Sequence, residues 1–398
     1  MVISHGNLAC EVASNATDLG LGPHARGVFW VPQYHDLGLI SVIASTIAGN
    51  SRTTLMSPLT FLQRPSVWFD VMARVRATHT AAPNFAFELA VRKTTPQQRA
   101  GWDLSSLRVV MSAAEPIRAS TMDKFFAAFD SIDESAFFPA YGLAEHTVSV
   151  SMGGGATLRV DRTALECGRV VPVSDGVPYL GCGRITKPGA VIRIVDPATR
   201  RACAPDEVGE IWVDSPTKGL GYWGMPEATA ETFQARIAGE PGDREYLRTG
   251  DLGFFHDGEL YVTGRCKDLI IVRGRNLYPA DIEDSLRDCH PLIRPGGVAS
   301  FAVDAGDGEG LVIFVEARAD KVSTAEADEI VEAVRRRVYE EHQLGCHAVV
   351  LGLAGTVRKT TSGKVRRLAC KQAFLTGEIE AAPQTIRVAT LPIAREVL

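Results

Sequence analysis

Short apolar runs alternate with helical patterns over the first 150 residues. Residues 27–32 (GVFWVP) and 107–113 (LRVVMSA) are apolar runs bounded by turn residues, which is typical of buried strands. Residues 37–49 (LGLISVIASTIAG) predict an apolar helix, and residues 120–129 (STMDKFFAAF) predict a second helix with Ser120 as its N-cap. Strands that alternate with helices predict a mainly parallel sheet covered on both faces.

The pattern changes after about Val150. Residues 191–201, 209–213 and 253–264 are short alternating strands with turn residues between them. In the last of these, Asp257-Gly258 is a strong indication of a two-residue hairpin turn. This middle part therefore predicts an antiparallel sheet.

A third pattern follows Arg265. A strand is expected at residues 268–274, a helix that begins at Pro279, and two paired strands at 297–304 and 310–318. A last strand is expected at residues 347–353. Residues 325–342 predict an amphipathic helix, and its apolar face consists of Ile330, Val331, Val334 and Val338.

These patterns predict an α/β protein of two domains. The first covers residues 1–265 and divides into an α/β sheet subdomain (1–150) and a β-rich subdomain (151–265). The second is a compact α+β domain over residues 266–398.

Composition excludes several classes of protein. The chain has 398 residues, 45% of them apolar, and a formal net charge of −5, so we expect no nucleic-acid partner. Its eight cysteines form no CxxC pair, which favours reduced thiols in a cytoplasmic protein over a zinc site. The start has no basic and apolar leader, and the longest apolar run is too short for a transmembrane segment.

Residues 358–367 (RKTTSGKVRR) contain a Ser-Gly-Lys that superficially resembles a phosphate-binding P-loop. A P-loop requires glycine five residues before Gly363 and Ser or Thr after the lysine, whereas Arg358 and Val365 occupy those positions. Taken alone, this stretch is typical of a solvated basic surface loop with Lys364 at its tip.

Five further motifs precede this loop in order and change its interpretation. The six are PQYHDLGLI (32–40), SAAEP (112–116), FPAYGLAEHT (138–147), YLRTGDLGFF (246–255), GRCKDLIIVRGRNLYPADIE (264–283) and RKTTSGKVRR (358–367). Together they resemble the adenylate-forming superfamily, and more narrowly its fatty acyl-AMP ligases. The resemblance extends nearly from end to end and implies the adenylate-forming fold, with a large N-terminal and a small, mobile C-terminal domain.

The resemblance implies a reaction in which a fatty or other carboxylic acid attacks the α-phosphate of ATP. The products are acyl-AMP and pyrophosphate, and the acyl group then passes to an acyl carrier protein. Negative charge builds up on the transferring phosphoryl group, so positioned cations supply much of the catalysis. Lys364 matches the family's C-terminal lysine, whose ammonium can bridge the acyl carboxylate and the α-phosphate.

The same resemblance assigns the other site residues. Asp251 would accept the ribose hydroxyls, Arg265 would make a second ribose contact, and Glu145 would bind Mg²⁺. His35 would lie near the acyl carboxylate, and Lys267 would be the pivot of an interdomain hinge. The positions that match nucleotide-binding residues are Ala113, Ala114, Glu115, Ala140, Tyr141, Gly142, Asp251, Arg265 and Lys364.

Structural roles compete with some of these assignments. Asp36 and Glu115 are also suited to capping a helix. A single histidine such as His35 is more often structural, and Asp251 has the spacing of a turn aspartate before a strand.

Residues 157–183 resemble the extra segment that fatty acyl-AMP ligases carry and acyl-CoA ligases lack. Two other functions remain open: an acyl-CoA ligase, and a degenerate relative that binds nucleotide or carrier protein without turnover.

The family's Gly/Ser/Thr-rich loop, which holds the β- and γ-phosphates, normally lies just upstream of the equivalent of residues 2–8 (VISHGNL). The glycine-rich stretch 151–157 follows the Glu145 motif and cannot replace it. From the resemblance we expect a truncated N-terminal domain and weak adenylation by the chain as written, because backbone N–H groups of such a loop hold the phosphate charges.

Overall fold

The computed structural model describes residues 1–272, 274–306, 308–319, 321–360 and 363–390. The chain divides into two compact units, Met1–Thr263 and a second that begins at Gly264. The sequence had placed the boundary after residue 265.

The first unit contains the predicted, mainly parallel sheet. Its strand order is β2-β1-β3-β4-β5-β6. All neighbours pair in parallel except β5 and β6, which are antiparallel. The strands are β1 (Arg26–Phe29), β2 (Arg52–Leu55), β3 (His79–Ala82), β4 (Val109–Ser112), β5 (Phe137–Gly142) and β6 (Ser149–Met152).

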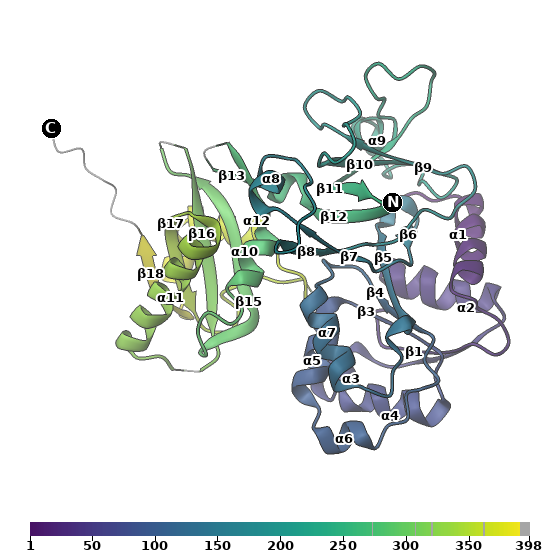
Figure 1. Cartoon of the computed structure of the whole chain (residues 1–398), viewed down its shortest axis with the longest axis horizontal. Coiled ribbons are helices and arrows are strands. Elements are labelled where there is room, and N and C mark those ends of the chain that lie inside the picture. The colour runs from purple at the N-terminus through teal and green to yellow at the C-terminus, as the bar shows by residue number, and fades with distance from the viewer. Residues whose placement is uncertain (273, 307, 320, 361–362, 391–398) are drawn as a thin grey trace. The chain divides into compact units, whose positions relative to one another are not determined.

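Helices connect and flank the strands of this sheet (Figure 1). They are α1 (His5–Asp18), the π-helix η1 (Leu37–Ala44), α2 (Ser45–Ala48), α3 (Pro58–Gln63), α4 (Ser66–Val75), α5 (Asn84–Lys93), α6 (Pro96–Ala100), α7 (Ala119–Ala128), and the short 3-10 helices η2 (Glu134–Ala136) and η3 (Ala144–His146). Ser120 was wrongly predicted as a cap. The N-cap of α7 is Arg118, which makes no side-chain cap, and its backbone N–H donates to Asn84 Oδ1 of α5 at 3.1 Å.

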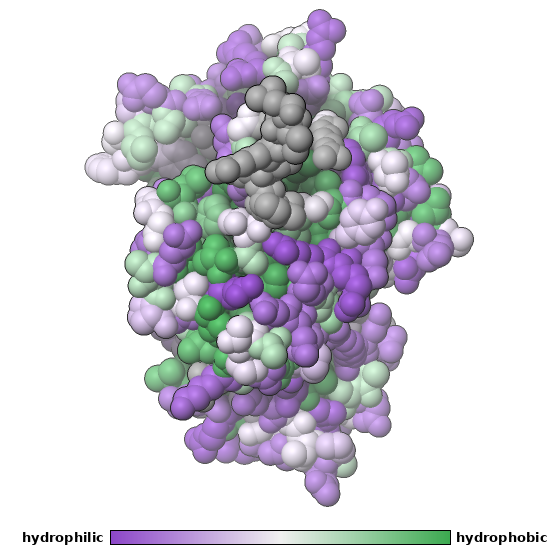
Figure 2. Space-filling view, turned by 90° about the vertical axis from the view of Figure 1, so that its left-hand side faces the viewer, coloured by the Kyte–Doolittle hydropathy of each residue, from purple (hydrophilic) through white to green (hydrophobic). Residues whose placement is uncertain are grey.

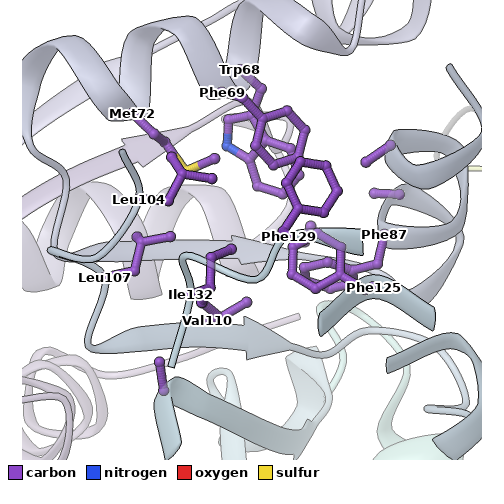
Figure 3. Packing of buried hydrophobic residues seen from close by; sticks show 14 of the residues in the cluster. Trp68, Phe69, Met72, Phe87, Leu104, Leu107, Val110, Phe125, Phe129 and Ile132 are labelled. Atoms are coloured by element: carbon purple, nitrogen blue, oxygen red, sulfur yellow. The ribbon is translucent and has the colours of Figure 1, made fainter. Parts of the chain in front are cut away.

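An aromatic core joins α4, α5 and α7 to one face of the sheet. Phe69 stacks on Trp102 and Phe129 with ring centroids 5.2 and 4.4 Å apart, and Phe87 meets Phe125 edge to face. Figure 3 shows the rings of Phe69, Phe87, Phe125 and Phe129, which belong to one apolar cluster with Val110 of β4. The next residue along β4, Met111, belongs to a separate cluster with Leu37 of η1, because successive strand side chains point to opposite faces. Both faces of the sheet are therefore covered, as predicted.

The rest of the first unit is rich in antiparallel strands. One sheet has the order β12-β11-β10-β9. Asp257 and Gly258, with φ of 48° and 79°, form the predicted hairpin turn between β11 and β12. The strands are β9 (Val191–Val195), β10 (Gly209–Asp214), β11 (Leu247–His256) and β12 (Glu259–Arg265), and α9 (Pro226–Phe233) lies between β10 and β11 in the sequence.

Residues 157–183 form a small element within this part. Strands β7 (Thr157–Val160) and β8 (Val177–Leu180) pair in antiparallel register, with α8 (Arg162–Glu166) between them in the sequence. Val170 N–H donates to Asp206 O and Val208 N–H donates to Gly168 O, so this segment is anchored to the turn before β10.

The second unit is the predicted α+β domain. Its main sheet has the order β15-β16-β17-β18, and β13 pairs with β14 in a separate hairpin. One apolar cluster contains the predicted face of α11, whose residues Ile330, Val331, Val334 and Val338 are all buried. A second cluster contains Cys370 and Ala373 of α12 together with alternate residues of the same sheet strands. Arg273, in the strand expected at residues 268–274, lies outside the described residues.

The elements of the second unit are η4 (Cys266–Asp268), β13 (Ile270–Val272), β14 (Arg275–Leu277), α10 (Pro279–Ser285), β15 (Ile293–Asp304), β16 (Glu309–Ala317), α11 (Thr324–His342), β17 (Cys346–Gly352), α12 (Arg367–Leu375), α13 (Glu378–Ala381) and β18 (Thr385–Thr390). The surface drawn in Figure 2 carries hydrophobic residues interspersed with hydrophilic ones. Within the described ranges, no helix combines the length and apolarity needed to cross a bilayer.

Candidate active site

Two predicted nucleotide-binding residues meet in the first unit. Tyr141, near the end of β5, donates a hydrogen bond from Oη to Asp251 Oδ2 of β11 at 2.8 Å. The two residues are 110 positions apart in the sequence, and Asp251 is only 6% exposed. A buried carboxylate with a fixed orientation is suited to accepting hydrogen bonds from a polar ligand.

Asp251 lies within β11, where the register of its pairing with β10 shifts between Glu210 and Trp212. Gly250 has φ of +70°, a conformation that favours glycine. Thr249 Oγ1 accepts from Asp251 N–H at 3.1 Å and donates to Ile211 O at 2.7 Å. Gly250 N–H donates to the Glu210 carboxylate at 3.1 Å. These contacts fix the Thr-Gly-Asp backbone from which the Asp251 carboxylate projects.

The Glu210 carboxylate is itself fixed. It lies on β10, is almost fully buried, and accepts two hydrogen bonds from the Arg248 guanidinium at 3.1 and 2.8 Å. Such bidentate pairs have a defined geometry. The backbone at Gly250 in β11 is therefore hydrogen-bonded to a carboxylate that a buried ion pair holds in place.

Glu145, the predicted metal ligand, has a partner that the sequence did not indicate. Tyr222 Oη donates to Glu145 Oε1 at 2.9 Å, and the Glu145 carbonyl accepts from Gly219 N–H at 2.8 Å. Burial and the adjacent carboxylate raise the pKa of Tyr222 to about 12, so its hydroxyl stays a donor at neutral pH.

The backbone after Glu145 is strained. Thr147 has φ of 68° and ψ of −63°, and Val148 N–H donates to His146 O at 2.8 Å across a three-residue turn. Such conformations cost on the order of 1–3 kcal/mol and concentrate at functional sites. Gly142 is required opposite this turn, because a Cβ there would lie 1.9 Å from Val148 O.

A buried polar network supports this turn. His146 Nδ1 lies 2.7 Å from Ser149 O and must carry the ring proton, so Nε2 accepts from Ser215 Oγ. Burial lowers the pKa of His146 to about 3, which keeps the ring neutral. The same Ser149 carbonyl accepts a hydrogen bond from Lys187 Nζ at 2.6 Å, and Lys187 Nζ also lies 3.3 Å from the Glu11 carboxylate.

This ion pair connects α1 to the segment before β9, and both of its buried side chains also bond to Ser149 of β6. Burial raises the pKa of Glu11 and lowers that of Lys187, while each charge partly offsets the effect on the other. The sequence had given no role to Glu11, Lys187 or His146.

The chemistry of Glu145 is compatible with a magnesium ion that is held mainly by substrate. One Glu145 oxygen is oriented by Tyr222, and the carboxylate is only partly buried. In the described part of the chain, no group of three or more His, Cys, Asp or Glu side chains could form a metal cage. Mg²⁺ commonly takes one or two carboxylates and completes its shell with phosphates and water.

His35 and Asp36 lie together at the start of η1. Asp36 is the N-cap of η1 and accepts from Leu37 N–H at 2.6 Å. His35 Nδ1 lies 2.6 Å from the same carboxylate oxygen, with 30% of its side chain exposed. Asp36 therefore caps a helix, as the competing structural interpretation held, and His35 remains partly accessible.

The SAAEP motif forms a turn after β4. Ala114 has φ of 72°, and Ala113 is buried. The Glu115 carboxylate accepts a hydrogen bond from Phe85 N–H in the first turn of α5. Glu115 thus caps α5, which favours the structural role over a direct nucleotide contact. Ala140 and Gly142 flank Tyr141 on β5.

The remaining predicted residues lie at the start and near the end of the second unit. Arg265 is the last residue of β12, and Lys267 lies in η4. Lys364 N–H donates to Thr360 Oγ1 at 3.0 Å, and Thr360 N–H donates to Lys364 O at 2.8 Å. Ser362 of the Ser-Gly-Lys motif lies outside the described residues.

Comparison with known proteins gives two family matches. A family described as AMP-binding enzyme matches residues 1–223. A family described as the AMP domain of Disco-interacting protein 2-like proteins matches residues 267–384. Between them they cover both units of the chain.

Individual relatives agree with these matches. The chain is 39% identical over 400 residues to the medium-chain-fatty-acid–[acyl-carrier-protein] ligase JamA of Moorena producens, covering 98% of this chain and 67% of JamA. It is 37% identical to a 4-hydroxyphenylalkanoate adenylyltransferase of Mycobacterium marinum, covering 94% and 62%.

A solved structure from a study of fatty acyl-adenylate ligases from E. coli and L. pneumophila matches with a TM-score of 0.85 and 31% identity, covering 96% of this chain and 68% of that one. The chain thus spans roughly two thirds of the length of these relatives.

Proposed function

Since the chain belongs to the fatty acyl-AMP ligase branch of the adenylate-forming, AMP-binding enzymes, we propose that it activates a carboxylic acid with ATP and passes the acyl group to a carrier-protein thiol. The observation that carries this proposal is the buried Asp251 carboxylate, which Tyr141 contacts and whose backbone is held within the Thr-Gly-Asp segment of β11. We further propose a cytoplasmic setting, because all eight cysteines are free thiols.

Asp251 would bind the ribose. Its carboxylate is acceptor-only when ionised, and both ribose hydroxyls are donors. Tyr141 Oη holds one carboxylate oxygen, and its ring is buried in an apolar cluster with Val150 and Ile211. Arg265, at the end of β12, would make a second ribose contact.

Lys364 would act on the reacting groups. In the first half-reaction a carboxylate oxygen of the acid forms a bond to the α-phosphorus, and the bond from that phosphorus to the pyrophosphate oxygen breaks. An ammonium between the two anions offsets their repulsion and the charge that develops on the phosphoryl oxygens. His35, partly exposed beside Asp36, would lie near the acid carboxylate.

Glu145 would hold Mg²⁺, and Tyr222 would orient its carboxylate. A bound Mg²⁺ supplies charge neutralisation at the phosphate oxygens.

The preferred acceptor is a carrier-protein thiol rather than free CoA. Two features support this choice: the relative JamA is named for an acyl-carrier-protein acceptor, and the anchored segment at residues 157–183 resembles the extra segment of fatty acyl-AMP ligases. The acid is a fatty acid or a related carboxylic acid, since one relative is named for medium-chain fatty acids and another for hydroxyphenylalkanoates.

The test is trapping of acyl-AMP with hydroxylamine in the presence of ATP, Mg²⁺ and a panel of alkanoic and arylalkanoic acids, followed by addition of a phosphopantetheinylated carrier protein or CoA. We expect acid-dependent hydroxamate and acylation of the carrier. Acyl-CoA as the main product would contradict the choice of acceptor. Binding of AMP without any hydroxamate would favour a non-catalytic nucleotide-binding relative.

A further inference from the structure

Arg367 joins three separate segments of the second unit. Its guanidinium donates from Nε and Nη2 to the Glu283 carboxylate of α10, at 2.8 and 2.7 Å. Its remaining nitrogen, Nη1, donates to Asp268 Oδ2 of η4 at 3.1 Å. The side chains of Arg367, Asp268 and Glu283 are only 19%, 17% and 7% exposed. The contact is therefore a largely buried, three-point clamp.

The Glu283 end of this clamp is fixed by further hydrogen bonds. The Glu283 carboxylate also accepts from Ser300 N–H of β15 at 3.0 Å, and Ser300 Oγ donates to Pro279 O at 3.1 Å. The two carboxylates raise the pKa of Arg367 above its usual value, and this effect outweighs desolvation. The guanidinium of Arg367 is thus held by a Glu283 carboxylate whose orientation is set by the backbone of β15.

Arg367 directly follows the hairpin that carries Lys364. Arg366 N–H donates to Arg358 O at 2.8 Å, and Lys359 and Val365 form a β-bridge. Arg358 N–H donates to Cys370 Sγ of α12 at 3.3 Å. The base of the hairpin is consequently attached to α12, whose first residue is Arg367.

Asp268 belongs to the other functional segment of this unit. It is the last residue of η4, adjacent to Lys267, the predicted hinge pivot. The second unit is compact, so its packing already carries the Lys364 loop along with any rotation of the backbone at Lys267. The Arg367–Asp268 contact adds a direct tie between the base of that loop and the residue next to the pivot.

We propose that Arg367 is a positioning residue that clamps the Lys364 hairpin to the hinge turn through Asp268, so that lysine and hinge move as one rigid piece. This inference rests on the proposed function for its consequence in catalysis, but the clamp itself can be tested without turnover. It assigns no contact between Arg367 and substrate.

The clamp is tested with two variants and a matched control. Arg367→Lys keeps the charge but loses the planar fork that makes three directed contacts. Asp268→Asn removes one charge and leaves the Glu283 pair intact. Asp328→Asn, which weakens an exposed ion pair to Arg387 in the same unit, is the control. Arg367→Ala is avoided, because it would leave the buried Glu283 carboxylate without its cation.

The first measurement is limited trypsin digestion under native conditions, with mass spectrometry of the cut after Lys364. We expect Arg367→Lys to speed this cut by roughly 5–30-fold, the factor that corresponds to a modest loss of local stability. Asp268→Asn should give a smaller increase, and the control should match the unmodified chain. Equal rates for all four proteins would overturn the clamp, whether or not the chain has activity.

The second measurement separates positioning from stability. For Asp268→Asn we expect kcat of acyl-AMP formation to fall about 10–100-fold with the KM for ATP nearly unchanged, as for a displaced catalytic group. Transfer from supplied acyl-AMP to a thiol should change less. Equal losses in both half-reactions, in proportion to a lowered melting temperature, would reduce Arg367 to a structural role. Absence of hydroxamate from the unmodified chain would instead contradict the proposed function.

Discussion

The buried Asp251 carboxylate gives the sharpest quantitative expectation. Asp251→Asn keeps the size of the side chain and an acceptor for Tyr141 Oη, which lies 2.8 Å from Oδ2. The fold should therefore change little in stability. What the variant loses is the negative charge that strengthens the hydrogen bonds from the two ribose hydroxyls of the nucleotide.

The size of the effect follows from the difference between charged and neutral hydrogen bonds. A bond to a charged acceptor contributes about 1.5–3 kcal/mol and a neutral one about 0.5–1.5 kcal/mol, so each ribose bond loses about 1 kcal/mol. Two bonds lose about 2 kcal/mol, which is a factor of about 30 in the Kd for AMP. 2′,3′-Dideoxy-AMP lacks both donors, so its Kd should respond far less to the substitution.

The assay is titration calorimetry or fluorescence with both nucleotides against the unmodified chain, Asp251→Asn, and Asp196→Asn as a control aspartate in a turn. Asp196 accepts local bonds from the N–H groups of Ala198 and Thr199. An equal loss of affinity for AMP and its dideoxy analogue would show that Asp251 acts through the fold. An unchanged Kd for AMP would refute the ribose assignment.

Four further predictions concern single residues. Lys364→Ala should lower the rate of acyl-AMP formation by about 10²–10³, the typical cost of a lost electrostatic donor, with AMP binding retained; near-normal hydroxamate formation would refute its role. Lys267→Pro should impair at least one half-reaction by restricting the hinge, and two unaffected half-reactions would move the hinge elsewhere. Tyr222→Phe removes the donor to Glu145 and should raise the Mg²⁺ concentration for half-maximal exchange by about 10–100-fold; an unchanged Mg²⁺ dependence would contradict the orientation of Glu145 by Tyr222. The pKa of His146 is lowered to about 3 from 6.5, so the unfolded chain binds a proton that the folded chain does not, and stability present above pH 6.5 should be lost as pH falls toward 3. Urea unfolding followed by tryptophan fluorescence, which reports the first unit because all five tryptophans lie there, should show a weaker pH dependence in His146→Gln, and identical slopes would contradict the assignment.

The sequence predicted features that depend on local pattern. The parallel sheet, the Asp257-Gly258 turn and the apolar face of α11 follow from periodicity and turn chemistry, and the structure confirms them. The N-cap at Ser120 was wrong because an interaction with Asn84 of α5 fixes the start of α7. A partner 34 residues away cannot be recognised from a local cap pattern.

The candidate site divides in the same way. Asp251, Tyr141 and Glu145 could be proposed as site residues because they lie in short motifs that match a family. Their supports were not found: Tyr222 contacts Glu145 from 77 residues away, and Glu11 contacts Ser149 from 138 residues away. No spacing rule connects such residues. Gly142 could have indicated that another backbone segment packs closely against β5, because a Cβ at this position would clash with Val148 O.

Acid-dependent exchange of labelled pyrophosphate into ATP tests the central proposal most directly, because it requires acyl-AMP to form and revert at one site. We expect exchange that appears only with a suitable carboxylic acid and is abolished by Lys364→Ala, with Asp251→Asn strongly reduced at subsaturating ATP. Measured tight binding of AMP together with no acid-dependent exchange, for any acid that the chain is shown to bind, would contradict an adenylating enzyme and leave a nucleotide-binding protein.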